Sequence, residues 1–347
     1  MLMDQIFQLL SKDIASVALL SVAGFGLAMV LTPLYTTLAY RYQWWKRPRK
    51  DAITGEKAVE FDRLHSAKHK RHIPTMAGVI VVVAVSLVTV VLNYSTRQTL
   101  LPLMALVGGG AVGLIDDVIN LLSPKGLTGL RSQVKFLLIS LVAAIGGFYM
   151  VTKLGYDSIY VPFLSDTITI GTISVFALFT FIVVASANAV NMTDGLDGLA
   201  GGLLISAFTA YTLIATLQGN IGIAGFCATM VGSLMAYTWF NIFPARFFMG
   251  DVGSFAMGAS LGVVAMLTDT LFLLPVIAGV FVIEAGSSLV QIMSKKLFNK
   301  KVFRIAPIHH HFEALGWPET KVTMRFWIIG QVFAIFGVVL AILGGIQ

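Results

Sequence analysis

The sequence predicts an all-α, polytopic integral membrane protein with about ten transmembrane helices. Hydrophobic residues make up 57% of its 347 residues and charged residues only 12%, about half the charged share of a soluble domain. Several apolar runs reach about 18 residues, which is long enough to cross a bilayer. The basic residues gather between these runs, as they do in multi-pass membrane proteins.

Ten apolar runs are candidate spans, and their ends are uncertain by a few residues. The first run is longer than a signal-peptide core and no small-residue cleavage site follows it, so we expect a retained helix. The ninth run contains Pro275, Gly279 and Gly286, so we expect it to be bent or broken. The runs are 15–40, 76–93, 100–116, 134–152, 171–189, 199–217, 221–240, 253–268, 271–294 and 325–345.

The basic residues orient these spans. Segments 41–74, 125–135 and 295–325, together with Arg246, hold 21 of the 24 Lys and Arg residues. If the first segment is cytoplasmic, alternation of the ten runs puts all of them in the cytoplasm, as the positive-inside rule requires. Both termini are then periplasmic. Basic clusters are also typical of nucleic-acid binding, but their place between spans favours a topology signal, and we expect no nucleic-acid partner.

One extramembrane element is expected on the periplasmic side. Apolar residues alternate in Ile159–Phe163 and again in Ile168–Ile170, with the turn signal Ser165-Asp166 between them. This pattern predicts a small β-hairpin. The single cysteine, Cys227, lies in an apolar run, so the sequence offers neither a disulfide framework nor a CxxC zinc motif. We treat residues 1–347 as one transmembrane domain.

Carboxylates gather at one predicted face of this domain. Asp116 and Asp117 follow an apolar run, so they are expected at the membrane–water boundary. Two adjacent carboxylates repel each other unless a cation, protons or water relieve them, and Mg²⁺ prefers such oxygen ligands. As an alternative, the pair consists of solvated residues at a helix end. Asp194, Asp197 and Asp251 have an alternative role as N-caps or first-turn acids of the next span.

Amides, histidines and cations share this face. The amides are Asn188, Asn191 and Asn241, and the histidines are the consecutive residues 309–311. Neighbours on a chain do not share one face, so we do not expect a three-histidine metal site. One or two of the rings are expected to reach a phosphate or the carboxylates; otherwise the segment is a solvated loop. Carboxylates for Mg²⁺, with cations and amides for phosphate oxygens, are the parts of a phosphoryl-transfer site.

Four motifs in this order resemble the phospho-N-acetylmuramoyl-pentapeptide transferases, a branch of the polyprenyl-phosphate N-acetylhexosamine-1-phosphate transferase superfamily. The similarity runs from about Pro74 to the C-terminus, and the last three motifs are specific. The motifs are LIDD at 114–117, NAVNMTDGLDGLAGG at 188–202, FNIFPARFFMGDVGS at 240–254 and PIHHHFEALGWPE at 307–319. HHHFE and TDGLDGLAGG favour this branch over the N-acetylglucosamine-phosphate relatives.

The resemblance implies that undecaprenyl phosphate attacks UDP-MurNAc-pentapeptide to give lipid I and UMP, with Mg²⁺ required, at the cytoplasmic face of the bacterial inner membrane. It implies that Asp116, Asp117 and Asp251 are the essential acids and metal ligands, with Asp251 our first choice for direct contact with Mg²⁺. The remaining expected catalytic residues are His309, His310 and His311. The expected substrate-binding residues are Thr75, Lys70, Lys125, Lys135, Asn188, Asn191, Asp194, Asp197, Asn241, Phe248 and Gln291, of which Phe248 is expected to stack on uracil.

The resemblance leaves alternatives open for Asn120, for the number of chemical steps and for the oligomeric state. The family often continues the acidic pair as DDxxK, but Asn120 stands at that position. Either Lys125 or another cation compensates, or that lysine is dispensable. Asp117 or Asp116 is expected to remove any remaining proton from the lipid phosphate, and a two-step route through an aspartyl-phosphate is the alternative. A homodimer is also left open, because some relatives are dimers but the sequence marks no dimer face.

Two other functions compete with this one. A UDP-GlcNAc:polyprenyl-phosphate GlcNAc-1-phosphate transferase would have similar motifs. A secondary transporter would also carry ionisable residues within its spans, but these carboxylates lie at one face of the membrane and no inverted repeat is visible.

Overall fold

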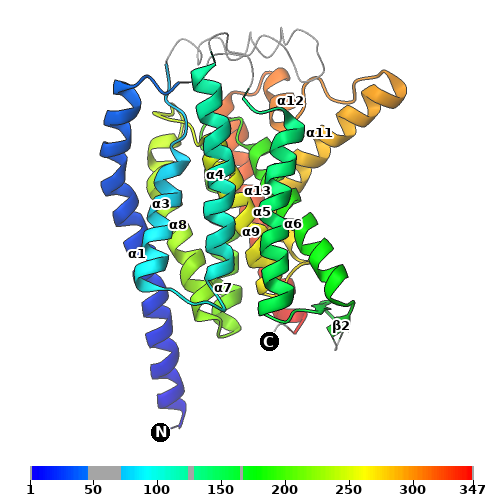
Figure 1. Cartoon of the computed structure of the whole chain (residues 1–347). Coiled ribbons are helices and arrows are strands. Elements are labelled where there is room, and N and C mark those ends of the chain that lie inside the picture. The colour runs from blue at the N-terminus through cyan, green and yellow to red at the C-terminus, as the bar shows by residue number, and fades with distance from the viewer. Residues whose placement is uncertain (1, 46–71, 124–128, 165–166, 346–347) are drawn as a thin grey trace.

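A computed structural model describes residues 2–45, 72–123, 129–164 and 167–345, and shows a bundle of long helices (Figure 1). Every predicted apolar run contains helix. The helices are α1 (Leu2–Arg41), α3 (Gly78–Leu92), α4 (Leu100–Leu122), α5 (Ser132–Lys153), α6 (Thr172–Thr193), α7 (Leu199–Leu217), α8 (Ile221–Asn241), α9 (Gly250–Leu267), α10 (Leu274–Ile277), α11 (Gly279–Phe298), α12 (Ile308–Ala314) and α13 (Glu319–Leu343).

The lengths and composition of these helices are those of a polytopic membrane protein. Within the described residues, eight helices are long and apolar enough to cross a membrane, namely α1 (from Lys12), α4 to α9 and α13. Helix α3 has only 15 residues. Helix α11 is not among the eight, and it carries Glu284, Lys295 and Lys296. The predicted count of ten spans therefore remains a prediction.

Helix α9 is the centre of the bundle. Of its most apolar 18-residue window, 94% is buried within the protein, although the helix is built largely from small residues. On α4, a Cβ added to Gly109 would lie 2.8 Å from the carbonyl oxygen of Phe255 on α9. On α9, a Cβ added to Gly258 would lie 2.7 Å from the Cα atom of Ala187 on α6. Small residues let these helices approach closely, which is how helices associate when burial from water contributes little.

The ninth predicted run is broken, as expected from its proline and glycines. It forms the short helix α10 and then α11, with Ala278 between them outside the helical conformation (φ −98°, ψ 28°). The break expected in the run 271–294 is therefore confirmed. Helix α11 leans away from the bundle axis at the end where α12 lies (Figure 1).

The predicted hairpin is present. Strands β1 (Ser158–Tyr160) and β2 (Thr167–Thr169) pair antiparallel, with Ile159 opposite Ile168. The predicted turn at Ser165-Asp166 lies outside the described residues. The hairpin lies toward the same end of the bundle as the first turns of α1 and the last turns of α13 (Figure 1).

The opposite end of the bundle collects the polar motifs. The last turns of α4, α6 and α8 meet the first turns of α5, α7 and α9 there, and α12 lies across them (Figure 1). Helix α12 was not anticipated, because its seven residues are too few for a clear periodic pattern. Segments far apart in the sequence are thereby brought to one end of the bundle.

Candidate active site

Three aspartates meet at this end of the bundle. Asp116 and Asp117 come from α4, and Asp251 comes from the first turn of α9. One oxygen from each carboxylate lies within 4.8 Å of the others. The prediction that the acidic pair ends a span is wrong, because α4 continues to Leu122 and both side chains are buried in it. The same observation excludes the alternative that they are solvated residues at a helix end.

Glycines make room for this acidic cluster of Asp116, Asp117 and Asp251. A Cβ added to Gly113 would lie 2.1 Å from the carbonyl oxygen of Asp251, and one added to Gly250 would lie 2.6 Å from Asp117 Oδ2. A Cβ on Gly129 would lie 2.3 Å from Asp116 Oδ1. Distances this short cannot be tolerated, so the absence of side chains at these positions lets backbone and carboxylates approach one another.

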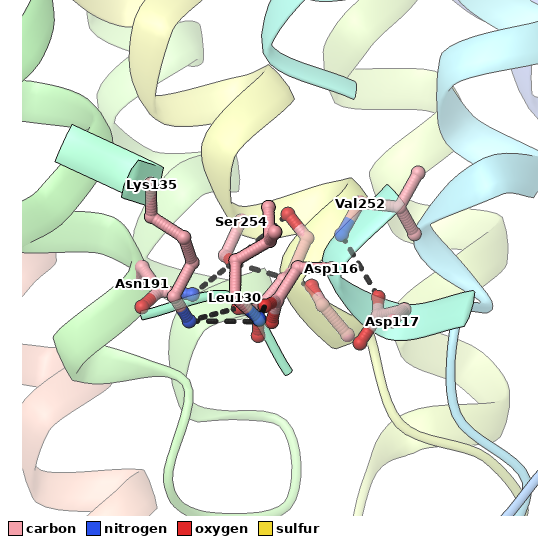
Figure 2. A network of polar contacts seen from close by, with 9 residues as sticks. Asp116, Asp117, Leu130, Lys135, Asn191, Val252 and Ser254 are labelled. Carbon is pink, nitrogen blue, oxygen red and sulfur yellow. Dashed lines mark hydrogen bonds and ion pairs between the residues drawn. The ribbon is translucent and has the colours of Figure 1, made fainter. Parts of the chain in front are cut away.

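Backbone amides already hold two of the carboxylates. The N–H of Leu130 donates to Asp116 Oδ1, and the N–H of Val252 donates to Asp117 Oδ2 at 3.1 Å (Figure 2). Val252 lies in the first turn of α9. The positive end of this helix therefore faces Asp117, which is a favourable position for an acidic side chain.

Lys135, in the first turn of α5, bridges the other two acids. Its Nζ lies 3.2 Å from Asp116 Oδ2 (Figure 2). The same atom lies 3.0 Å from Asp251 Oδ2. Its own side chain is 18% exposed. Asn120, which stands where the family often has lysine, is buried in α4. Lys125 lies outside the described residues, so Lys135 is the cation that the described part of the chain brings to the cluster.

The acidic cluster fits a hard divalent cation. It combines three carboxylates with one lysine, and oxygen ligands of this kind suit Mg²⁺. Asp251, the most exposed of the three with a 14% exposed side chain, is the one best placed to share an ion with a substrate.

The loop between α6 and α7 is held by other predicted site residues. Asp194 ends α6, and Gly198 precedes α7 with φ 77°. The alternative that Asp194 or Asp197 caps α7 is therefore wrong. Asp197 Oδ2 accepts the Ala245 N–H at 3.0 Å, and Asn241 Oδ1 accepts the Gly198 N–H at 3.0 Å. Asp197 and Asn241 thus tie this loop to the segment after α8.

Two further amides lie on α6. Asn191 Nδ2 donates to the Ser254 hydroxyl on α9 at 2.8 Å, which places the side chain beside the acidic cluster (Figure 2). Asn188, one turn earlier, donates to the Val184 carbonyl of its own helix at 2.8 Å. Asn191 is therefore the α6 amide that joins the polar network with α9.

Thr75 and Phe248 are brought together by backbone pairing. The Phe248 N–H donates to the Pro74 carbonyl at 2.8 Å, and the Ala77 N–H donates to the Phe248 carbonyl at 3.0 Å. Thr75 is buried and Phe248 is half-buried. Lys70, predicted to join them, lies outside the described residues.

The three histidines do not all share one face, but two neighbours do, with the rings of His309 and His310 4.0 Å apart. His309 and His310 turn toward Gly195, whereas His311 Nδ1 accepts the Arg304 N–H at 3.1 Å. Burial, and next the neighbouring His309, lower the pKa of His310 to about 4, although Glu313 and Glu284 oppose this shift. His310 is therefore neutral near pH 7.

Gln291 organises the chain that leads to α12. Its Oε1 accepts the N–H groups of Val302 and Phe303 at 3.0 Å each, and its Nε2 donates to the Phe303 carbonyl at 3.1 Å. Two acids in this region, Glu284 and Glu313, contact the histidines although neither was a predicted site residue. A lone acid within the apolar run 271–294 was the available signal for Glu284, because ionisable residues in spans usually have a function or a partner.

Comparison with known proteins decides the family. Residues 99–269 match the family described as Glycosyl transferase family 4, a segment that includes the three aspartates. A phospho-N-acetylmuramoyl-pentapeptide-transferase of Geobacillus kaustophilus is 36% identical over 321 residues, which cover 91% of this chain and 94% of the relative. One from Rubrobacter xylanophilus is 40% identical over 270 residues, covering 76% and 82%. The chain belongs to the phospho-N-acetylmuramoyl-pentapeptide transferase family.

Family membership extends beyond the matched segment. A phospho-N-acetylmuramoyl-pentapeptide-transferase of Clostridium kluyveri is 35% identical over 317 residues, covering 90% of this chain and 96% of the relative. Alignments of this length extend well beyond residues 99–269. The transferase family identified from four short motifs is confirmed over nearly the whole chain.

Proposed function

We propose that this protein transfers phospho-MurNAc-pentapeptide from UDP-MurNAc-pentapeptide to undecaprenyl phosphate, producing lipid I and UMP. The observation that carries this proposal is the meeting of Asp116, Asp117 and Asp251 beside Lys135 in a chain of this family. Phosphoryl transfer depends mainly on positioning and charge stabilisation, and a site with acids for a metal and a cation for phosphate supplies both.

The chemistry requires two anions to meet. An oxygen of the lipid phosphate forms a bond to the β-phosphorus of the nucleotide sugar. The bond from that phosphorus to the bridging oxygen breaks, and UMP leaves with the electron pair. Lys135 offsets negative charge on the phosphates, and Asp117, or Asp116, takes any proton that remains on the lipid phosphate. Asp251, with Asp116 and Asp117, would hold Mg²⁺, which supplies positive charge to the diphosphate when bound.

The location of the site suits one substrate that arrives from the membrane and one that arrives from water. The acidic cluster lies at one end of a bundle whose long helices are apolar enough to cross a membrane, so a lipid acceptor can arrive from the bilayer and a nucleotide sugar from water. We assign this end to the cytoplasmic face of a bacterial inner membrane, because described basic residues such as Arg41, Lys135 and Lys295 lie on the helix ends there. The ten-span topology with periplasmic termini is part of the same proposal.

The decisive experiment measures UMP release by the purified protein in detergent. UDP-MurNAc-pentapeptide and undecaprenyl phosphate are supplied with Mg²⁺, and matched reactions contain UDP-GlcNAc or EDTA. We expect UMP only with the MurNAc substrate and only with the metal. Release from UDP-GlcNAc alone would support the GlcNAc-1-phosphate transferase, and solute flux in liposomes without UMP release would support a transporter.

The number of chemical steps needs a separate measurement. The direct route forms no covalent enzyme intermediate, whereas the alternative places the phosphosugar on an aspartate. Incubation with the nucleotide sugar in the absence of the lipid, followed by acid quench and mass spectrometry, should show unmodified Asp117. A phosphorylated Asp117 peptide would refute the direct route.

A further inference from the structure

The acid with the least obvious purpose is Glu284. It lies on α11 and is completely buried, as is His309. Its Oε2 atom lies 2.8 Å from Nδ1 of His309 on α12. A buried carboxylate is costly unless it is paired. His309 is the side chain that pairs with the buried Glu284.

Helix α12 has a second attachment to α11, through Ser287. The Ser287 hydroxyl donates to the Glu284 carbonyl at 2.7 Å and accepts the Ile308 N–H at 3.0 Å. The start of α12 is therefore held by Ser287 as well as by the Glu284 carboxylate, which also takes backbone hydrogen bonds from Ile308 and His309. What the Glu284 side chain adds beyond Ser287 is control over the orientation and the proton of one imidazole ring.

His310 and Glu313 form a second histidine–carboxylate pair. His310 Nδ1 lies 2.7 Å from Glu313 Oε2, and the two imidazole rings are 4.0 Å apart at an interplanar angle of 62°. Each ring thus turns its Nδ1 atom toward its own carboxylate. The partner of His310 comes from the same short helix, whereas the partner of His309 comes from a different one.

The opposite nitrogens of both rings face the loop between α6 and α7. A Cβ added to Gly195 would lie 2.4 Å from His309 Nε2 and 3.2 Å from His310 Nε2. Gly195 is exposed and directly follows Asp194. The His309 ring therefore lies between a buried carboxylate on one side and the loop of the proposed nucleotide-sugar site on the other.

We propose that Glu284 is a positioning residue for the transfer reaction and acts through His309. By accepting the Nδ1 proton, its carboxylate fixes the tautomer and plane of the ring and keeps Nε2 directed at the substrate beside Gly195. Carboxylates that hold histidines in this way are known to orient ligands and general bases. This inference rests on the proposed function, since it assigns Glu284 a part in that same site.

The test compares two replacements of Glu284. Glu284→Gln keeps an oxygen that can accept the Nδ1 proton, whereas Glu284→Leu keeps the volume but offers no acceptor. We expect kcat/KM to fall less than about tenfold in the glutamine variant and about 30- to 100-fold in the leucine variant. Ser288→Ala, which removes another buried polar group from α11, is the matched control and should retain wild-type kcat/KM.

A double-mutant cycle separates positioning from a purely structural role. If Glu284 acts only through the ring, Glu284→Leu should lower kcat/KM by less than about threefold when His309→Asn is already present. An equal loss in both backgrounds, or wild-type kcat/KM in a folded Glu284→Leu protein, would overturn the proposal.

A spectroscopic measurement needs neither turnover nor a folded leucine variant. ¹⁵N-histidine spectra of the wild-type protein should contain a ring with a protonated Nδ1 that disappears in His309→Asn and shifts in Glu284→Gln. A His309 signal with neutral, unprotonated Nδ1 would contradict the proposal. Failure of the wild-type protein to release UMP would refute the proposed function instead, and would leave this spectroscopic result standing.

Discussion

The acidic cluster and the histidine couples lie at the same end of the bundle but are stabilised in opposite ways. Backbone N–H groups donate to Asp116 and Asp117, and Lys135 lies between Asp116 and Asp251. Each histidine couple instead brings its own carboxylate to its own ring. We therefore expect the acidic cluster to need positive charge from a bound ligand. Each histidine couple carries its own carboxylate partner and, in our proposal, orients an imidazole ring.

The largest effect should follow from changing the acidic cluster itself. Asp251→Asn keeps the shape of the side chain but removes a charge that lies beside Lys135 and that the proposed Mg²⁺ would use. We expect kcat to fall about 10³-fold at saturating Mg²⁺, with an unfolding temperature close to that of the wild type. UMP release and a thermal melt in detergent measure the two quantities. Wild-type turnover would refute the assignment of Asp251 to the metal.

The histidine region should respond to pH through stability. The pKa of His310 falls from 6.5 to about 4 on folding, so the unfolded chain binds the extra proton between these values and the folded protein does not. Stability is therefore complete above about pH 6.5 and decreases as the pH falls toward 4, by about 3 kcal/mol at most.

Comparing His310→Gln with the wild type isolates this contribution. Denaturant or thermal unfolding from pH 4 to 7 should show a smaller loss of stability at low pH in the variant. Identical pH profiles for both proteins would mean that His310 does not titrate differently in the folded and unfolded states, and the contrast between the two regions would weaken.

Close packing of α4 against α9 is the next feature to test. Gly113→Ala places a Cβ 2.1 Å from the Asp251 carbonyl oxygen, so we expect a loss of about 2 kcal/mol in stability and reduced activity as the aspartates move apart. Gly26→Ala is the matched control, because that position on α1 has no atom within 4 Å of the added Cβ. If both variants behave alike, the close approach of the two helices is not what assembles the cluster.

The smallest effect concerns the cation of the cluster. Lys135→Gln should lower kcat/KM about tenfold, because the phosphates lose a charged partner. The same change should tighten the binding of Mn²⁺, since Lys135 no longer competes for Asp116 and Asp251. A paramagnetic titration without substrate measures this affinity. Weaker Mn²⁺ binding in the variant would show that Lys135 supports the metal site.

Hydropathy was sufficient to locate the helices but not their ends. Each apolar run became helix, yet α4 extends past Asp116 and Asp117 to Leu122. Two carboxylates at the end of an apolar run suggest exposure to solvent. Here, instead, the glycines of α4 allow a close approach of α9, and the start of α9 and Lys135 supply partners for these acids inside the protein. Such partners come from elsewhere in the chain, and a local pattern cannot reveal them.

The roles of single polar residues were still less accessible. Asp197 and Asn241 were chosen from a motif as substrate contacts, and the structure shows both side chains bonded to the backbone of neighbouring loops. Gln291 likewise holds the segment before α12. A motif records that a residue type is required but does not say whether the ligand or the protein requires it, so their contact with substrate remains a prediction.

By itself, the sequence determined that this is a helical membrane protein of a transferase family, because apolar length and motif order are properties of the chain read in one dimension. Tertiary structure alone decided which charges meet. Asp116 and Asp251 are 135 residues apart, as the gap between their numbers shows, and they converge because Gly113 lets two helices touch. Glu284 and His309 are likewise brought together by tertiary packing, here of α12 on α11. Electrostatic partners act over a few ångströms, and only the folded chain sets distances on that scale.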